Sequence, residues 1–472
     1  MPKWLDAALD YLPRWLEFQL NELQQPGCTF AVSHRGEPLL ECAFGFADLE
    51  RKERMTPQHR FRVASHSKSF TATGVMKLVE ARKLRLDAPV GRYVDGLHAD
   101  VAGRTLRQLL SHGSGVHRDG RDSGQWDVRR PFLSERDLRA DLATAPTLQA
   151  DVRFKYSNHA FGLIGLAIEA VTGEPYVQWI RREVVRAAGL AHTEPDVARA
   201  TRRAPSSTRR RQGSPAAAGV PFATGYSMRT PLGRRPIGRD LPTHALAAAT
   251  GFVSTAADLV KYFDQLDPQS PRSFLSVKSR RTMTTARLDI PGIPAGRQYG
   301  LGIARGRVGK TEWFGHGGGF PGYLTRTSVI PSERVTFSIL SNAIDGMAPV
   351  WADVIVDMFA TFARRGAPTG SARRWTGRWW NAWGVNDLVP MGDRVLVARP
   401  IQVNPFIGAS ELAVRGDRGR IVVADGYGTY GEATRLVRGR RGRATELWLG
   451  GGQLLPEDAF VTAFRRRTAK RS

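Results

Sequence analysis

The stretch Val63-Ala64-Ser65-His66-Ser67-Lys68-Ser69-Phe70 sets a serine hydroxyl and a lysine amine three residues apart, where an extended segment is expected to become a helix. Residues with this spacing share one helix face, so the Lys68 amine can reach the Ser65 hydroxyl. A serine hydroxyl needs an adjacent base to attack a carbonyl, and a desolvated lysine can serve as that base. The stretch therefore predicts a nucleophilic serine. The alternative is an N-capping serine followed by a solvent-facing lysine.

A second polar motif, Tyr156-Ser157-Asn158, precedes a helical pattern that begins near Phe161. If the fold brings this motif to the serine, the Tyr156 phenol can relay a proton to a leaving group. The Asn158 amide can then hydrogen-bond a substrate amide. The structural alternative is that Asn158 caps the helix and Tyr156 packs with its hydroxyl outward.

A third motif is the glycine-rich run Gly315-His316-Gly317-Gly318-Gly319-Phe320-Pro321-Gly322-Tyr323, which follows a predicted strand. Its glycines let a substrate backbone approach the strand edge, and the Gly319 N–H can join the Ser65 N–H in an oxyanion hole. The alternative is a long glycine turn. The run also matches GxGxxG, but strand-like residues follow it where a dinucleotide site needs a helix, so a dinucleotide site is excluded.

Taken in order, Ser-x-x-Lys, Tyr-x-Asn and His-x-Gly resemble the motifs of the serine β-lactamase and penicillin-binding-protein superfamily. The likeness is to its class C-like branch, which includes D-aminopeptidases, carboxylesterases and peptidase S12 enzymes. Leu109–Gly115 (LLSHGSG) is similar to the family segment Leu-Leu-x-His-Thr-Ser-Gly. The resemblance covers about residues 27–365. It implies three catalytic residues, Ser65, Lys68 and Tyr156, and four substrate-binding residues, Asn158, His316, Gly318 and Gly319.

This resemblance implies a cofactor-independent serine hydrolase, without a metal, that acts through an acyl-enzyme on amide, peptide or ester bonds. Its substrate would be a small molecule or a short peptide. The alternatives are a β-lactamase or DD-peptidase-like penicillin-recognising enzyme, and a non-catalytic protein that binds acyl groups or peptidoglycan fragments. His316 stands where penicillin-recognising members place a lysine, and histidine is largely neutral at pH 7. We therefore expect uncharged acyl groups to be favoured over β-lactams.

The order of predicted elements indicates an α+β fold, with an antiparallel sheet flanked by helices and a helical subdomain, as in β-lactamases and transpeptidases. We expect this domain over residues 1–365 and a linker at 366–374. The closely spaced strands and glycine turns of 375–472 predict a small antiparallel β-barrel, similar to the lipocalin-like barrels appended to some D-aminopeptidase-like members. Its core is expected to hold four tryptophans: Trp375, Trp379, Trp380 and Trp383.

The formal net charge is +25, from 69 Lys and Arg against 44 Asp and Glu. The arginine runs mostly lack interleaved aromatics, which favours a solvated basic surface over a specific nucleic-acid groove. One such run, 199–221, predicts a mobile loop. Neither a secretory signal nor a run of about 18 apolar residues is present, so we expect no membrane span and a cytoplasmic location. With only Cys28 and Cys42, a reduced compartment is the simpler interpretation.

Overall fold

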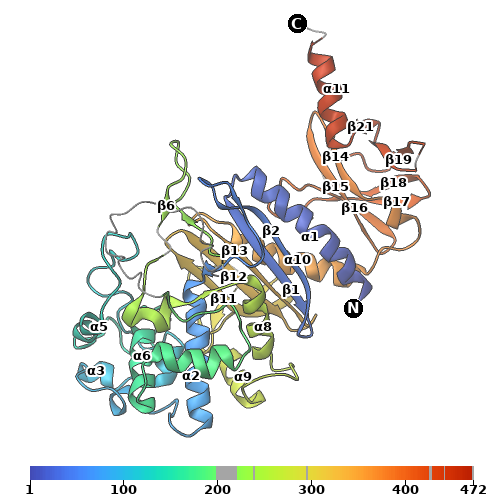
Figure 1. The fold of residues 1–472 in the computed structure, drawn as a ribbon. Helices are drawn as coiled ribbons and strands as arrows, with labels where there is room; N and C mark the ends of the chain where they lie inside the picture. Colours follow the sequence, from blue (N-terminus) through green and yellow to red (C-terminus); the bar gives the residue numbers. More distant parts are fainter. Residues whose placement is uncertain (198–220, 238–239, 294–295, 425–427, 441, 470–472) are drawn as a thin grey trace, which may run out of the picture. The chain divides into compact units, whose positions relative to one another are not determined.

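The computed structural model describes residues 1–197, 221–237, 240–293, 296–424, 428–440 and 442–469 (Figure 1). The chain divides into two compact units, one formed by Gln25–Ala352 and the other by Met1–Gln24 with Asp353–Ser472. Segment 199–221, for which the sequence predicts a loop, lies outside the described residues except for Pro221. The N-terminal helix thus clusters with the C-terminal strands, a grouping that the sequence did not indicate. The domain boundaries at 365 and 375 stay a prediction.

The larger unit is built on a nine-stranded antiparallel sheet in the order β3-β2-β1-β13-β12-β11-β10-β9-β8. Figure 1 labels β1, β2, β11, β12 and β13 of this sheet. The N-terminal hairpin joins the later strands because Cys28 pairs with Ser341 and Phe30 with Ile339. Its strands are β1 (Gly27–His34), β2 (Glu37–Asp48), β3 (Glu53–Arg54), β8 (Leu288–Asp289), β9 (Gln298–Tyr299), β10 (Ala304–Val308), β11 (Thr311–Phe320), β12 (Tyr323–Ile330) and β13 (Val335–Ser341). The predicted α+β class is confirmed.

The glycine-rich run lies inside a strand. β11 continues through all of it to Phe320, and Pro321-Gly322 then forms a two-residue turn into β12. Gly322 has φ +90°, a conformation that glycine adopts without steric cost. The alternative of a long glycine turn is therefore wrong, because strand pairing extends from Phe314 with Val329 to Phe320 with Tyr323.

Helices of the larger unit pack around α2, whose residues from Ser67 to Met76 are all buried. α2 contacts α6, α7, α9 and the turn η5, while α8 covers β1, β12 and β13. The helical segments are η1 (Ala64–His66), α2 (Ser67–Glu80), η2 (Val90–Arg92), α3 (Ala99–Ala102), α4 (Leu106–Leu110), α5 (Glu135–Leu142), α6 (Asn158–Thr172), α7 (Tyr176–Ile180), η3 (Arg181–Arg186), η4 (His244–Leu246), η5 (Ala247–Gly251), α8 (Ala256–Leu266) and α9 (Val277–Thr284). Two short pairs complete the unit, β4 (Phe61–Arg62) with β7 (Val253–Ser254) and β5 (Gly225–Tyr226) with β6 (Pro236–Ile237).

The smaller unit contains an eight-stranded antiparallel sheet that runs in sequence order. Its ends meet where Trp380 and Leu455 exchange backbone hydrogen bonds of 2.7 and 2.8 Å, so the sheet forms a nearly closed barrel. The strands are β14 (Gly377–Asn381), β15 (Gly384–Met391), β16 (Arg394–Ala398), β17 (Ser410–Arg415), β18 (Arg418–Val423), β19 (Ala433–Arg438), β20 (Ala444–Leu449) and β21 (Gly452–Leu454). The predicted C-terminal barrel is confirmed.

Only part of the expected tryptophan core is present. Trp375 and Trp379 are buried among the leucines and valines of the barrel. Trp380 is only partly buried, and Trp383 is 97% exposed because it lies in the turn between β14 and β15. A tryptophan in a hairpin turn has no facing strand to pack against, so the expectation was wrong for Trp383.

Three helices and a 3₁₀ turn accompany the barrel: α1 (Lys3–Glu22), α10 (Ala348–Arg365), η6 (Gly370–Arg374) and α11 (Glu457–Ala469). α1 buries one face, and its Gln19 amide donates to the Pro400 carbonyl at 2.6 Å. Tyr11 stacks on Phe406 with ring centroids 5.7 Å apart. No helix within the described parts of the chain has the length and apolar character needed to cross a membrane. Cys28 and Cys42 are free thiols.

The packing of α1 predicts that a change on its buried face destabilises the smaller unit. Leu16 is fully buried, so Leu16→Ala removes packed methyl groups and should cost about 2–5 kcal/mol in the free energy of unfolding. Glu17→Ala, on the exposed face of the same turn, should change it by no more than about 0.5 kcal/mol. Denaturant unfolding followed by tryptophan fluorescence measures both. Equal effects of the two variants would contradict the burial of this face.

Candidate active site

Ser65 lies in the tight turn η1 that leads into α2. Ala64 before it has φ +47°, a left-handed conformation that is costly for a residue with a Cβ and that the surrounding bonds must hold. The Ser67 hydroxyl supplies such bonds, because it donates to the Ala64 carbonyl at 2.5 Å and accepts from the Phe252 N–H at 3.0 Å. Ser65 is the only residue from 61 to 70 that is not fully buried. The turn therefore presents the Ser65 side chain.

The Ser65 hydroxyl is bonded to two functional groups. It lies 2.5 Å from the Tyr156 phenol oxygen and 3.2 Å from the Lys68 amine. Neither η1 nor α2 has a side-chain N-cap, and Lys68 is completely buried. The alternative of a capping serine and a solvent-facing lysine is therefore wrong.

Lys68 has an environment suited to a neutral amine. It donates to the Asn158 side-chain oxygen at 2.7 Å and to the Ala249 carbonyl at 2.8 Å, which uses both hydrogens of a neutral amine and leaves its lone pair for the Ser65 hydroxyl. Burial lowers the pKa of Lys68 well below its ordinary value, and the Asp119 carboxylate opposes this shift. Burial disfavours the charged form of any amine, so the shift favours a form that can accept a proton.

Tyr156 and Asn158 meet Lys68 at the N-terminus of α6. The cap of this helix is Ser157, whose hydroxyl accepts from the Ala160 N–H, so the idea that Asn158 caps it is wrong. The Asn158 side-chain nitrogen donates to Asp119 at 2.6 Å. Burial raises the pKa of Tyr156 above its usual range, which keeps the phenol protonated at neutral pH. Tyr156 is therefore a proton donor in the resting site.

His316 lies on β11 with both ring nitrogens engaged inside the protein. One nitrogen is 2.6 Å from the Gly317 carbonyl and the other 2.7 Å from the Tyr299 hydroxyl. A carbonyl only accepts, so Nδ1 carries the proton and Nε2 accepts from Tyr299. Burial and the neighbouring His66 lower the pKa of His316 well below its usual value. The ring is thus neutral near pH 7, and its contact with substrate stays a prediction.

Gly318 and Gly319 occupy different environments although they are neighbours. A Cβ on Gly318 would lie 2.2 Å from the Val63 carbonyl oxygen, so this glycine lets β11 approach the η1 turn. Gly319 is exposed. Paired residues alternate between bonded and unbonded along β11 and β12, and the tight turn after Phe320 places Gly319 in an unbonded pair. Its N–H therefore points away from β12, past the end of β10.

A pocket of about 410 Å³ opens over Ser65. Three of its lining residues are arginines, Arg118, Arg297 and Arg326, and none is acidic. The rest are Ser65, Trp126, Phe154, Tyr156, Asn158, Ile290, Ile293, Tyr299, Ala304, His316, Gly317 and Gly319. Five of the seven sequence-predicted residues line the pocket: Ser65, Tyr156, Asn158, His316 and Gly319. The other two, Lys68 and Gly318, are buried and are not among its lining residues. Among the residues that the structure describes, no cluster of His, Cys, Asp and Glu could hold a metal ion.

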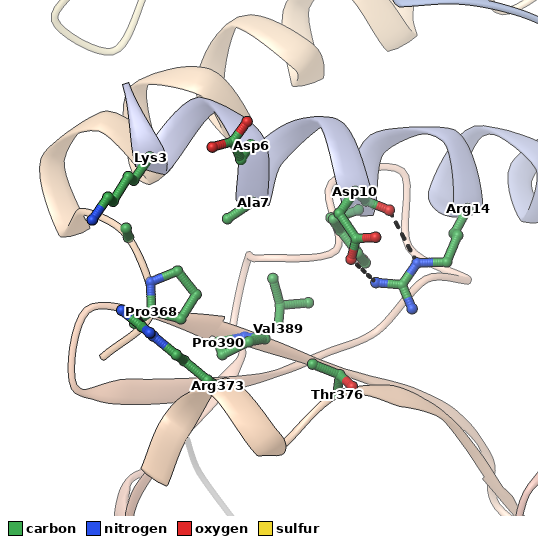
Figure 2. A pocket seen from close by; sticks show the side chains of 12 residues that line it. Lys3, Asp6, Ala7, Asp10, Arg14, Pro368, Arg373, Thr376, Val389 and Pro390 are labelled. Carbon is green, nitrogen blue, oxygen red and sulfur yellow. Dashed lines mark hydrogen bonds and ion pairs between the residues drawn. The ribbon is translucent and has the colours of Figure 1, made fainter. Parts of the chain in front are cut away.

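A separate pocket of about 510 Å³ lies within the smaller unit (Figure 2). It is lined by residues of α1 and of the segment from Ala367 to Pro390. Arg14 donates to the Asp10 carboxylate at 3.0 Å along α1, so these charges neutralise each other. The pocket holds none of the three sequence motifs, and we do not assign the candidate active site to it.

Two residues that the motifs did not single out complete the site. Asp119 is only 7% exposed, and its carboxylate contacts the Asn158 amide, the Trp126 indole at 2.9 Å and the Arg118 guanidinium at 3.0 Å. His112, inside the LLSHGSG segment, packs on the Tyr156 ring with centroids 4.3 Å apart. The segment marked the position of His112, whereas no sequence signal distinguished Asp119 from other loop acids.

Comparisons with known proteins fit this geometry. The chain matches the family "Beta-lactamase" over residues 13–356. Protein flp of Staphylococcus aureus (strain COL) is 25% identical over 182 residues, 38% of this chain and 36% of flp, so the match spans about a third of that relative. An octameric penicillin-binding protein homologue from Pyrococcus abyssi has a TM-score of 0.62 at 20% identity, covering 95% of this chain and 99% of that one. A D-stereospecific amidohydrolase from Streptomyces sp. has a TM-score of 0.57 at 25% identity, covering 70% and 93%.

Gly318 and Gly319 allow a matched test of the close approach between β11 and the η1 turn. Gly318→Ala should lower the free energy of unfolding by about 1–3 kcal/mol, because its Cβ meets the Val63 carbonyl next to the nucleophile turn. Gly319→Ala should be tolerated, since its Cβ would meet only Leu324 at 3.4 Å and the backbone N–H is kept. Thermal unfolding and hydrolysis rates measure both effects. A stable, active Gly318→Ala variant would contradict the close approach.

Proposed function

Because this chain belongs to the Beta-lactamase family, we propose that its serine hydrolase activity uses Ser65 as nucleophile and acts on amide bonds of amino-acid amides or short peptides. The observation that carries the proposal is the buried Lys68 amine, 3.2 Å from the Ser65 hydroxyl and with its pKa lowered by burial. A neutral amine in this place can take the serine proton as the nucleophile attacks.

Acylation would proceed through the hydrogen bonds already present. As Ser65 Oγ bonds to the substrate carbonyl carbon, its proton passes to Lys68. The Gly319 and Ser65 N–H groups would stabilise the oxygen anion that forms. The carbon–nitrogen bond then breaks while the Tyr156 phenol protonates the departing amine, and the Lys68 ammonium returns a proton to the Tyr156 phenolate.

Deacylation would reverse these proton movements. Water attacks the acyl carbon, and its proton passes to the base formed by Lys68 and Tyr156. The bond between Ser65 Oγ and the acyl carbon then breaks, and the serine oxygen regains a proton. The free acid leaves and the resting hydrogen bonds re-form. An ester would follow the same path with an alcohol as leaving group.

The pocket lining supports a substrate with an apolar side chain. Trp126, Phe154 and Tyr299 provide aromatic surface beside Ser65. The D-stereospecific amidohydrolase among the structural neighbours supports the amide class, and we leave the stereochemistry to the assay. Three arginines, Arg118, Arg297 and Arg326, line the pocket and can attract a carboxylate. Although His316 is neutral, the pocket as a whole therefore does not favour uncharged substrates over carboxylate-bearing ones, contrary to the expectation from the sequence.

Loss of the nucleophile tests the proposal most directly. Ser65→Ala should abolish hydrolysis of D- and L-phenylalanine amide and of a short acyl ester while the protein stays folded. Lys68→Ala should be almost as severe, because the two residues act as one unit. Lys83→Ala, an exposed lysine just beyond the same helix, is the control and should retain full activity.

Labelling separates an enzyme from a protein that only binds acyl groups. A fluorophosphonate should label Ser65 in the unmodified protein with one-to-one stoichiometry, and mass spectrometry of the peptide should locate the adduct. A folded protein with an unlabelled Ser65, or a Ser65→Ala variant with most of its activity, would overturn the assignment.

The pH dependence follows from the lowered pKa of Lys68. The neutral amine is the active form, so kcat/KM should fall as the pH decreases through that pKa. Because burial lowers the pKa well below 10.5, the enzyme should already be active near neutral pH. A profile of kcat/KM against pH measures this fall, which we call the acidic limb. Activity that appears only above about pH 10, near the ordinary lysine pKa, would contradict a buried neutral base.

A further inference from the structure

The side-chain amide of Asn158 has a hydrogen-bond partner at each end, and one of these partners fixes which way the amide points. Its oxygen accepts from Lys68 at 2.7 Å and its nitrogen donates to Asp119 at 2.6 Å. A carboxylate accepts and an amine with a proton donates, so a flipped amide would face acceptor to acceptor at Asp119. Asp119 therefore decides that the amide oxygen, rather than the amide nitrogen, points at Lys68.

The Asp119 carboxylate is itself held in place. Its Oδ1 accepts both from Asn158 and from the Trp126 indole at 2.9 Å, while Oδ2 lies 3.0 Å from Arg118 Nε. All three partners line the pocket over Ser65, whereas the carboxylate is 7% exposed and does not line it. Asp119 thus sits behind the pocket wall, where it can act on the catalytic base without touching substrate.

Several charged and titratable groups face Lys68. Burial has the largest effect and lowers the Lys68 pKa; the Asp119 carboxylate opposes this lowering, and the Arg118 guanidinium adds to it. The Tyr156 ring lies 4.6 Å from the amine, and His112 and His316 both have lowered pKa values to which Lys68 contributes. Among these side chains, Asp119 is the one that bears a negative charge. Without it, burial would leave an amine too weakly basic to take the serine proton effectively.

We propose that Asp119 is the positioning residue of the catalytic base: its carboxylate locks the Asn158 amide with the oxygen toward Lys68 and supplies the negative charge behind that amine. This inference rests on the proposed role of Lys68 as base. Both ends of the Asn158 amide are already bonded inside the protein, its oxygen to Lys68 and its nitrogen to Asp119. Asn158 therefore supports Lys68, in addition to any contact that it makes with substrate.

The two parts of the proposal can be separated by two substitutions. Asp119→Asn keeps an oxygen that can accept from Asn158 and Trp126, and it removes the charge together with the acceptor that faces Arg118. Its acidic limb of kcat/KM should move to lower pH by about one unit, which corresponds to a tenfold change in proton affinity. Asp119→Ala removes the acceptor as well, frees the amide to flip and should lower kcat by about 100-fold.

Two further variants exclude a merely structural effect. Arg118→Gln removes the cation that lowers the Lys68 pKa, so its acidic limb should move in the opposite direction, to higher pH. Asp127→Asn changes an exposed acid of the same loop and should leave the limb unchanged. If Asp119 and Arg118 act on Lys68 through their charges, Asp119→Asn and Arg118→Gln should shift the acidic limb of kcat/KM in opposite directions. A loosened loop would not produce opposite shifts.

The outcomes are decisive for each part. A limb for Asp119→Asn that coincides with that of the unmodified protein would overturn the electrostatic role, and an Asp119→Ala variant with unchanged kcat would overturn the positioning role. If Asp119→Ala does not fold, Asp119→Asn still decides the electrostatic role, and Asp119→Ser, a milder truncation that also removes the carboxylate from Asn158, takes its place for the positioning role. Fluorophosphonate labelling of Ser65 in the unmodified protein is measured in parallel, so failure of the proposed function is distinguished from failure of this inference.

Discussion

The burial of one amine is the constraint on which the rest of the site depends. Lys68 has no access to solvent, and every hydrogen bond it makes must come from the protein. Ser65, Asn158 and Ala249 provide them. A lysine in such a place costs less when it is neutral, so the burial of Lys68 also suits it to the proposed role of base. Packing and the proposed catalysis therefore depend on the same placement.

Three parts of the larger unit have to meet for this to happen. α2 carries Lys68, the N-terminus of α6 carries Asn158, and the turn η5 offers the Ala249 carbonyl. Helical contacts between α2, α6 and η5 bring these parts together, and β11 closes the opposite side of the pocket. The site thus lies between the helices and the sheet, where large buried surfaces on both sides hold it rigid.

The close packing of the helices and the sheet around the site also explains where the backbone departs from ordinary geometry. Ala64 adopts a positive φ just before Ser65, the proposed nucleophile, and Gly318 has no room for a side chain against Val63. Strain of this kind persists only where surrounding contacts hold it, and here it aims Ser65 at the pocket. In the smaller unit, by contrast, the barrel closes through regular strand pairing, and Trp383 is left exposed in a turn.

The sequence by itself determined the α+β class, the C-terminal barrel and three motifs that the fold brings to one pocket. These follow from local spacing and periodicity, which are properties of neighbouring residues. Only the tertiary structure decided that the glycine run is a strand, that His316 is saturated by Tyr299 and Gly317, and that Asp119 stands behind Lys68. Asp119 and Lys68 are far apart in the chain, and an aspartate in a loop has the same local pattern whether it faces solvent or a buried amine. The glycine run and His316 have partners nearer in sequence, but glycine favours turns as strongly as it permits a strand, so the local pattern did not choose between them.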